Sequence, residues 1–322
     1  MFTILWEKIR KNKLQVSIFG VFLLIFLSFL IGSPSVFTRF NIYYSFMSTI
    51  PLFGIMALAM TFVITLGEID LSFTGVLAVS AWIFGKLLHV TGNIWIAALA
   101  GLLFGLAAGF LNAFLIVRIG IPSIVATIGT MFFWRGTVNV LAQGMGISLV
   151  PAKGTVFYEM CVGRIFGIIP AQAVWFVGLG IVFYFILNRH KFGSHVLFVG
   201  DNKESAKMMG INVKMVKTMV FMLMGFFAAF AGMLSTLEVT YFWPNQGEGY
   251  LLTTLAAVFI GGTSVFGGKA TIIGTIIGAL IIGSLEAGIV AIGLTAFWLQ
   301  FVYGLIIILS VAIYAFLIRK RE

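Results

Sequence analysis

Residues 189–217 read RHKFGSHVLFVGDNKESAKMMGINVKMVK, and residues 218–234 continue as the apolar run TMVFMLMGFFAAFAGML. The first of these is the longest strongly polar stretch in a sequence of 322 residues that is 61% hydrophobic and 9% charged. Soluble domains carry about 25% charged residues. The composition therefore predicts one integral membrane domain over residues 1–322, with the polar stretch in a loop at the edge of the membrane.

This loop contains the pattern of a short helix. Asp201 can act as the N-cap, Glu204 follows three residues later, and Gly210 stands where the helix would end. A helix of about two turns is too short to be stable alone in water. We therefore expect it to be held by the rest of the protein or by a partner.

Apolar runs along the chain predict an all-α, polytopic bundle of about ten transmembrane helices, because each run is near the ~20 residues that a helix needs to cross ~30 Å of hydrocarbon. If the short runs on either side of residues 67–72 and of 267–270 are re-entrant, the number falls to about eight. The runs are 15–32, 51–66, 73–88, 94–117, 124–142, 170–188, 218–240, 251–266, 271–289 and 297–318.

Basic residues flank the predicted spans and give the chain a formal charge of +10. They gather in residues 8–13, 189–217 and 319–321. Cytoplasmic segments carry an excess of Lys and Arg, so we expect both termini (the first being 1–14) and the loop 189–217 in the cytoplasm. The long loop 143–169 then lies outside. The basic surface is expected to face anionic lipid and a cytoplasmic partner and not nucleic acid, because the sequence has no groove-reading motif.

A weak internal repeat appears at an offset of 173 residues. By the predicted topology the two copies run in opposite directions, as in transporters built from inverted repeats. In so apolar a sequence such matches also arise by chance, and both explanations stay open. The matches pair Gly101, Gly105 and Ile119-Gly120 with Gly274, Gly278 and Ile292-Gly293.

Catalytic, metal and cofactor sites are not expected. Cys161 is the only cysteine, so an intrachain disulfide is impossible. The three histidines lack metal-ligand spacing. Residues 261–270, GGTSVFGGKA, look like a phosphate-binding loop, but Lys269 comes one residue late and Ala270 replaces the Ser or Thr that would hold magnesium. We therefore expect no ATP hydrolysis on this chain.

Three motifs, in the right order, resemble the ribose- and xylose-type sugar permeases, which are membrane subunits of ABC importers. ESAKMMG (204–210) resembles the E-A-A-x-x-x-G loop that docks into an ATPase subunit, although the I-x-L-P tail of that loop is absent. GEIDLSFTG (67–75) resembles G-G-I-D-L-S-x-G, with Glu68 in place of the second glycine. AAVFIGGTSVFGG (256–268) is close to A-A-V-x-x-G-G-T-S-x-F-G-G.

The resemblance implies a permease subunit for a monosaccharide in a bacterial plasma (inner) membrane. Its implied partners are a second permease copy, identical or not, a separate cytoplasmic ATPase and a soluble sugar-binding protein outside. The residues that the resemblance assigns to the ATPase-coupling helix are Asp201, Asn202, Glu204, Ala206, Gly210 and Ile211.

Polar residues and glycines near or within the apolar runs are candidates for the pathway or its gate, because charges at membrane depth are costly. Asp70 and Ser72 either cap a broken helix or line the pathway; the alternative is a polar turn at the inner surface with Asp70 as a plain N-cap. A buried Glu286 would have to be paired or protonated. The complete candidate set is Glu68, Asp70, Ser72, Arg135, Gly261, Gly262 and Glu286.

Arg135 lies inside a predicted span, and Glu238 and Glu248 lie at the predicted outer end of the seventh span. Arg135 needs a carboxylate or carbonyl partner if it is buried; the alternative is a position close to the outer surface. Glu238 and Glu248 bracket Tyr241-Phe242-Trp243-Pro244. They either contact the binding protein or the sugar, or they are solvated loop charges.

An ion-coupled secondary transporter of a small polar solute is the rival hypothesis, with Glu68, Asp70 and Glu286 as relay groups. The polar loop 189–217 discriminates between the two, because a secondary carrier has no need of a capped helix shaped to meet an ATPase. Transport that persists without an ATPase subunit would favour the rival.

Overall fold

The computed structural model of the chain describes residues 13–295 and 297–319. The predicted cytoplasmic N-terminus (1–14), except for its last two residues, and the basic residues 320–321 lie outside the described residues. Eight described helices are long and apolar enough to cross a membrane. They are α2 (Lys13–Gly32), α4 (Phe40–Thr65), α5 (Phe73–Thr91), α6 (Ile94–Phe114), α7 (Ser123–Ala142), α9 (Ala171–Arg189), α12 (Val213–Val239) and α14 (Ile272–Ala291).

Two further apolar helices, α13 (Tyr250–Ile260) and α15 (Phe297–Arg319), complete the bundle of described residues. The prediction of a polytopic helical bundle is therefore confirmed. Three predicted runs have wrong limits. The run 218–240 begins earlier than predicted, because α12 already starts at Val213. The run 251–266 ends early, at Ile260, because Gly262 adopts a φ of +82° and turns the chain. The run 51–66 is only the second part of α4, whose first turns carry polar residues that lower the local hydropathy.

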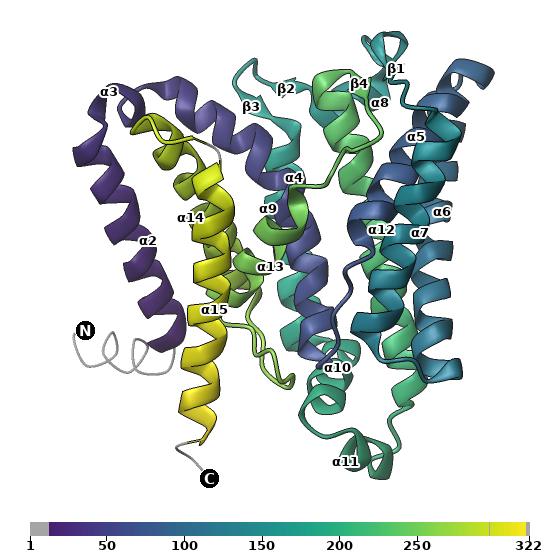
Figure 1. The fold of residues 1–322 in the computed structure, drawn as a ribbon, viewed down its shortest axis with the longest axis vertical. Coiled ribbons are helices and arrows are strands. Elements are labelled where there is room, and N and C mark those ends of the chain that lie inside the picture. The colour runs from purple at the N-terminus through teal and green to yellow at the C-terminus, as the bar shows by residue number, and fades with distance from the viewer. Residues whose placement is uncertain (1–12, 296, 320–322) are drawn as a thin grey trace.

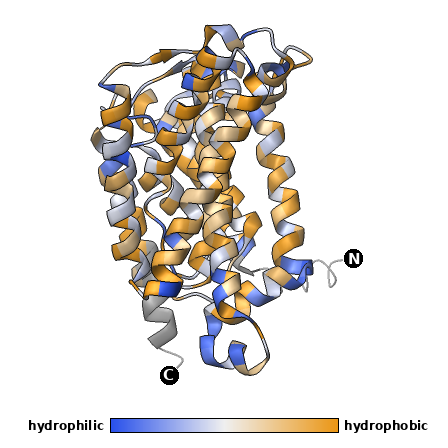
Figure 2. Cartoon of the chain, turned by 90° about the vertical axis from the view of Figure 1, so that its right-hand side faces the viewer, coloured by the Kyte–Doolittle hydropathy of each residue, from blue (hydrophilic) through white to orange (hydrophobic). Residues whose placement is uncertain are grey.

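Short elements gather at the two ends of the bundle (Figure 1). One end carries α3 (Pro34–Phe37), η2 (Val150–Ala152), α8 (Val156–Val162) and two antiparallel strand pairs. These pair β1 (Ile147–Ser148) with β4 (Tyr241–Phe242), and β2 (Arg164–Ile165) with β3 (Ile169–Pro170). The other end carries α10 (Lys191–Asp201) and α11 (Lys203–Met208), and α2 begins and α15 ends on that side. Figure 2 shows an apolar middle with hydrophilic residues toward both ends.

The order of the helices follows the internal repeat. An offset of 173 residues carries α4 onto 213–238, which is α12 without its last residue. The same offset carries α5, α6 and α7 onto segments that overlap α13, α14 and α15. In Figure 1, α4 runs toward the α11 end whereas α12 runs away from it. The two sets of four helices therefore repeat in inverted orientation. Of the matched glycines, Gly101 and Gly105 lie in α6, and Gly274 and Gly278 lie in α14.

Glycines bring helices into backbone contact both between the two sets and within the second set. A Cβ added at Gly105 in α6 would lie 2.4 Å from the carbonyl oxygen of Gly225 in α12. A Cβ added at Gly278 in α14 would lie 2.1 Å from the carbonyl oxygen of Ala257 in α13. Small residues at such contacts let membrane helices pack closely. Together with the buried second part of α4, these contacts form the core of the bundle.

Breaks in the helical path precede α5 and α13. A Cβ added at Gly75, near the start of α5, would lie 2.9 Å from the carbonyl oxygen of Met131, which is more than two turns along α7. The chain between α4 and α5 therefore enters the bundle before α5 begins. On the other side, residues 243–249 lead from β4 to α13, whose 11 residues span only about 16 Å.

Candidate functional site

The short helix α11 begins one residue later than predicted. The Oδ1 atom of Asn202 accepts hydrogen bonds from the backbone N–H groups of Glu204 (3.0 Å) and Ser205 (2.9 Å), so Asn202 is the N-cap. The prediction that Asp201 caps this helix is wrong, because Asp201 is still the last residue of α10. An N-cap needs non-helical backbone, and Asn202, with a φ of −153°, is the residue that supplies it between the two helices.

The other end of α11 closes as predicted, at Gly210. Gly210 has a φ of +79°, its N–H donates to the carbonyl of Lys207, and the N–H of Ile211 donates to the carbonyl of Ala206. This is a Schellman motif, in which a left-handed glycine satisfies the last carbonyl groups of a helix. Ala206 and Ile211 are buried and anchor α11 to the protein.

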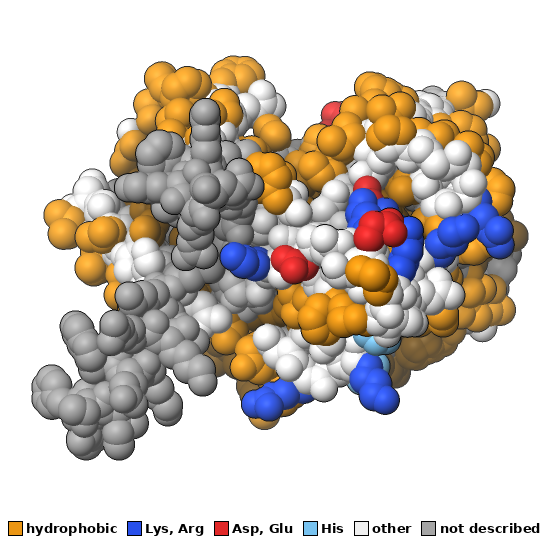
Figure 3. Space-filling model, turned by 90° about the horizontal axis from the view of Figure 1, so that it is seen from below, with side chains coloured by type: hydrophobic (Ala, Val, Ile, Leu, Met, Phe, Trp, Pro, Cys, Tyr) orange, Lys and Arg blue, Asp and Glu red, His pale blue; other side chains and the backbone are white. Residues whose placement is uncertain are grey.

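Most of the other side chains of α11 are exposed, although Lys203 pairs with Glu68. Glu204 and Lys207 are exposed and form an ion pair of 2.7 Å, and next to them Met208 is 82% exposed. Figure 3, seen from the α11 end, shows acidic and basic side chains side by side with apolar ones on this face. The helix therefore presents a surface of mixed charged and apolar character.

Glu68 lies between α11 and α12. Its Oε1 atom accepts from Lys203 Nζ at 3.3 Å and from Lys217 Nζ, and its side chain is 9% exposed. Burial opposes its ionisation, but hydrogen bonds from Lys217 and Ser123 and the two lysine charges outweigh burial and hold its pKa below the ordinary value of 4.5. We call these three residues the Glu68 cluster (Glu68, Lys203, Lys217).

Asp70 is buried at the start of α5 in a polar network. Its Oδ1 atom accepts from the Ser72 backbone N–H (2.8 Å) and from Ser72 Oγ (2.6 Å). Asn112 Nδ2 donates to Ser72 Oγ at 2.6 Å, and Thr130 Oγ1 donates to Asn112 Oδ1 at 2.7 Å. Burial raises the pKa of Asp70 to about 6, against the opposing hydrogen bonds from Ser72 and Asn112. The network joins α5, α6 and α7.

This arrangement bears on the two interpretations of Asp70, as a residue of a broken helix or as part of a polar turn at the inner surface. With 1% exposure, Asp70 is not part of a surface turn, and it satisfies a backbone N–H just before the helix that follows the break. Sequence reasoning missed Asn112 and Thr130 as its network partners. Asn112 had one sequence feature, a polar side chain within the otherwise apolar helix α6. Thr130 had none, because α7 contains several other polar residues.

Arg135 connects the two breaks. Its guanidinium group donates to the carbonyl oxygens of Pro244 (3.1 Å) and Gln246 (2.9 Å), which precede α13, and to that of Thr74 (3.0 Å) in the first turn of α5. Arg135 is half-buried, and these are the carbonyl partners that an arginine within a span needs. Arg135 thus holds corresponding regions of the two repeats at a fixed distance.

Gly261 and Gly262 turn the chain after α13 and permit close packing. A Cβ added at Gly261 would lie 2.6 Å from the backbone nitrogen of Thr275 in α14. The loop that follows returns to the α11 end, where the Gly268 N–H donates to the Thr65 carbonyl at 2.9 Å. A Cβ added at Gly200 in α10 would also meet this carbonyl. The ends of α4 and α10 and the α13–α14 loop therefore meet at one point.

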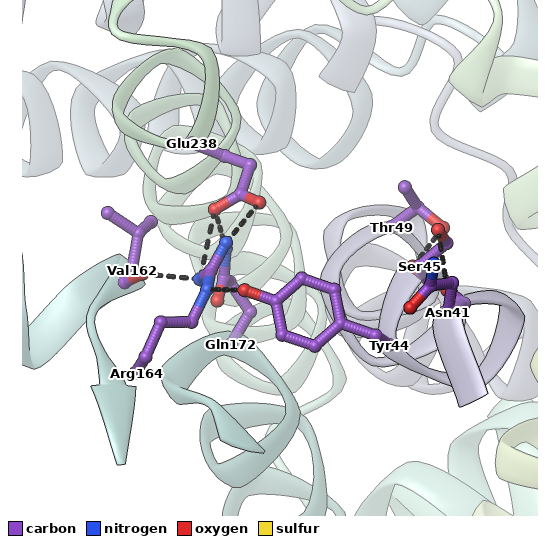
Figure 4. A network of polar contacts seen from close by, with 8 residues as sticks. All are labelled: Asn41, Tyr44, Ser45, Thr49, Val162, Arg164, Gln172 and Glu238. Carbon is purple, nitrogen blue, oxygen red and sulfur yellow. Dashed lines mark hydrogen bonds and ion pairs between the residues drawn. The ribbon is translucent and has the colours of Figure 1, made fainter. Parts of the chain in front are cut away.

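Glu238 belongs to a second charged cluster at the opposite end of the molecule (Figure 4). Its carboxylate accepts from Arg164 (2.8 and 3.4 Å) and from Gln172. Arg164 also donates to the Tyr44 hydroxyl and lies 5.1 Å from the centre of that ring. We call this group the Glu238 cluster (Tyr44, Arg164, Gln172, Glu238). Because the carboxylate already has partners inside the chain, Glu248, which is exposed, is the freer of the two predicted docking charges.

Polar side chains are also exposed on membrane-spanning helices. Asn41, Ser45 and Thr49 follow one another at four-residue spacing along the first turns of α4 and are all exposed (Figure 4). Glu286 is exposed on α14, which packs against α4 where Gly283 meets Ile50. Exposed polar groups on such helices are costly against hydrocarbon.

The chain is similar to known proteins over most of its length. The family described as "Branched-chain amino acid transport system / permease component" matches residues 42–311. The ribose import permease protein RbsC of Escherichia coli K12 is 31% identical over 285 residues, which cover 87% of each chain. The L-arabinose ABC transporter permease protein AraH of Azospirillum brasilense is 31% identical over 307 residues, 95% of this chain and 88% of the relative. The autoinducer 2 import system permease protein LsrC of Salmonella choleraesuis is 31% identical over 255 residues, 79% of this chain and 72% of the relative. No solved structure matches.

Proposed function

The chain belongs to the permease-component family of branched-chain amino acid transport systems, and we propose that it forms the translocation pathway for a monosaccharide in an ABC importer. Two of the similar permeases carry ribose and L-arabinose in their names, and both relatives are covered almost end to end. The proposed solute is therefore a small sugar that a soluble binding protein delivers.

The single observation that carries the importer proposal is the geometry of α11. The helix is capped at both ends and anchored by buried Ala206 and Ile211, while Glu204 and Met208 project outward. A two-turn helix held so rigidly at the surface of a membrane protein is suited to dock into another protein. We assign this surface to the ATPase subunit, which would carry out the ATP hydrolysis.

Charge supports a cytoplasmic position for this end of the molecule. Basic residues concentrate on α10, α11 and their neighbours, as the positive-inside rule expects of cytoplasmic segments. The opposite end, with the exposed Glu248, would face the binding protein outside a bacterial plasma membrane. The basic residues at the α11 end are Arg189, Lys191, Lys203, Lys207, Lys214 and Lys217.

A second permease copy would cover the exposed polar groups on the spans. Asn41, Ser45 and Thr49 of α4 and Glu286 of α14 would face hydrocarbon if the chain stood alone. Placed at the boundary with a second copy, they would line a water-filled path, where polar groups within spans are usually found. We therefore propose that the pathway lies along this face of α4 and α14.

Co-purification of the ATPase subunit with tagged permease tests the proposal. Glu204→Lys reverses a charge on the docking surface, and Gly210→Pro requires a negative φ where the chain has +79° and removes the N–H that closes α11. Both variants are expected to insert normally and to lose the ATPase. Glu159→Lys, the same charge change at an exposed residue of α8, is the matched control and should retain it. Normal ATPase recovery with both α11 variants, or uptake driven by an ion gradient without any ATPase, would overturn the importer proposal in favour of a secondary carrier.

A further inference from the structure

We propose that Glu68 is a positioning residue that ties α11 to the break between α4 and α5, so that a movement of α11 is passed to the start of α5. This inference rests on the proposed function, in which a partner displaces α11. It assigns the coupling step to the ion pairs of the Glu68 cluster.

The first step of the argument is the unequal environment of the two lysines. The Lys217 side chain is 13% exposed and the Lys203 side chain is 49% exposed. Lys217, on α12, is therefore the fixed partner that keeps the buried carboxylate charged. Lys203, the first residue of α11, is the partner that can approach and leave, because its ammonium group can be solvated when the pair opens.

The second step is that Glu68 sits on a short segment fixed at both ends. The Glu68 N–H donates to the Val63 carbonyl at the end of α4 (3.2 Å), and the Ile69 N–H donates to Ser123 Oγ in α7 (3.2 Å). One residue further, Asp70 enters the network with Ser72 and Asn112. A force applied at the Glu68 carboxylate therefore acts on the first turn of α5 through only four residues.

The third step is that three elements are in contact: the end of α10, the end of α4 and the loop between α13 and α14. The Gly268 N–H bonds to the Thr65 carbonyl, and Gly200 packs against that carbonyl so closely that a Cβ would not fit. The backbone of α10 therefore contacts both repeats at Gly200. The charged contact between α11 and the α4–α5 break is the ion pair of Lys203 with Glu68. A closely packed core transmits such shifts instead of absorbing them.

The experiment uses the complete complex, with ATPase subunits and binding protein, in proteoliposomes. Lys203→Gln opens the variable ion pair and leaves Glu68 and Lys217 in contact. Lys203→Arg restores the charge, and Lys191→Gln removes an exposed charge from the neighbouring helix α10 as a control. ATPase recovery, ATP hydrolysis, solute uptake and the thermal unfolding midpoint are measured for each variant.

We expect Lys203→Gln to retain the ATPase and the unfolding midpoint while uptake per ATP hydrolysed falls about tenfold, a typical size for a coupling between sites. Lys203→Arg should restore most of this ratio and Lys191→Gln should leave it unchanged. An unaltered ratio in Lys203→Gln, or a loss of uptake explained wholly by a lost ATPase, would overturn the role of Glu68. Failure of the parent chain to bind an ATPase would instead overturn the proposed function.

Discussion

The Glu68 cluster and the Glu238 cluster lie at opposite ends of the same pair of helices, α4 and α12. Both contain one carboxylate that connects these helices to a third element. At the α11 end the carboxylate takes two lysines, flexible side chains with point charges, and one of them is half-exposed. At the opposite end it takes the amide of Gln172 and one arginine, whose planar group bonds both carboxylate oxygens and stacks on Tyr44.

The difference indicates a division of roles. An arginine held by a carboxylate, a hydroxyl and a carbonyl has little freedom, so the Glu238 cluster fixes the β2–β3 hairpin and α9 to the end of α12 that lies away from α11. A carboxylate shared between two lysines can lose one partner and keep the other. We therefore expect the contact at the α11 end to change during transport and the contact at the opposite end to stay.

The largest expected effect is that of Glu68→Ala. The substitution leaves the ammonium group of Lys217 buried without a counter-charge, and breaking a buried pair in this way costs about 3–5 kcal/mol. Reversible unfolding in mixed micelles measures the loss, with Glu159→Ala as the exposed control. A loss no larger than that of the control would remove the physical basis of the comparison.

Glu238→Ala is expected to have a smaller effect, about 2 kcal/mol, because Arg164 loses its charge-assisted hydrogen bonds but keeps the Tyr44 hydroxyl and the Val162 carbonyl. The same unfolding assay applies. Uptake per ATP hydrolysed should stay near that of the parent. If this ratio fell as far as in Lys203→Gln, the two clusters would not differ in role.

Arg164→Lys isolates the contribution of geometry, since it keeps the charge. The lysine cannot reproduce the two-oxygen contact or the stacking on Tyr44, and we expect a loss of about 1 kcal/mol in the unfolding free energy. At the other end, Lys203→Arg should change stability by less than this. Equal changes in unfolding free energy at the two positions would mean that the use of arginine in one cluster and lysine in the other does not reflect a difference in their roles.

The smallest expected effect is the pH dependence of the stability that Glu68 contributes. The folded-state pKa of Glu68 is held below 4.5, so its contribution to stability is present above that pH and is lost only as the pH falls through the folded-state value. The difference in unfolding free energy between the parent and Glu68→Gln should therefore be constant from pH 7 to pH 5. It should shrink as the pH is lowered further; a difference that shrinks already between pH 7 and pH 6 would show that the pKa is not lowered.

Much of the fold follows from local pattern. Long apolar runs predicted the helices, and Gly210 predicted the end of α11 because a left-handed residue after a short polar helix is a local requirement. The N-cap was wrong for an equally local reason. Asp201 and Asn202 are both residue types that cap helices well. Asn202 becomes the N-cap because α10 continues through Asp201, and the sequence of α10 does not predict where that helix ends.

The contacts of the site could not be predicted in this way. Glu68 meets lysines that are 135 and 149 residues away, and Arg164 meets Glu238 across 74 residues. Such pairs depend on how the helices are stacked, and no periodicity encodes them. The sequence predicted that Arg135 needs a partner if it is buried, but only the structure identifies its carbonyl partners at the two breaks.

Site-directed cross-linking tests the central claim, that the α11 end meets the ATPase, most directly. The native Cys161 is buried, and burial raises the pKa of its thiol to about 12, so introduced cysteines can be modified selectively. Met208→Cys and Phe166→Cys place a thiol at side chains that are 82% and 92% exposed at opposite ends of the molecule. In the assembled complex we predict that a thiol cross-linker joins Met208→Cys to the ATPase subunit and does not join Phe166→Cys to it. Capture of the ATPase by Phe166→Cys and not by Met208→Cys would contradict the account.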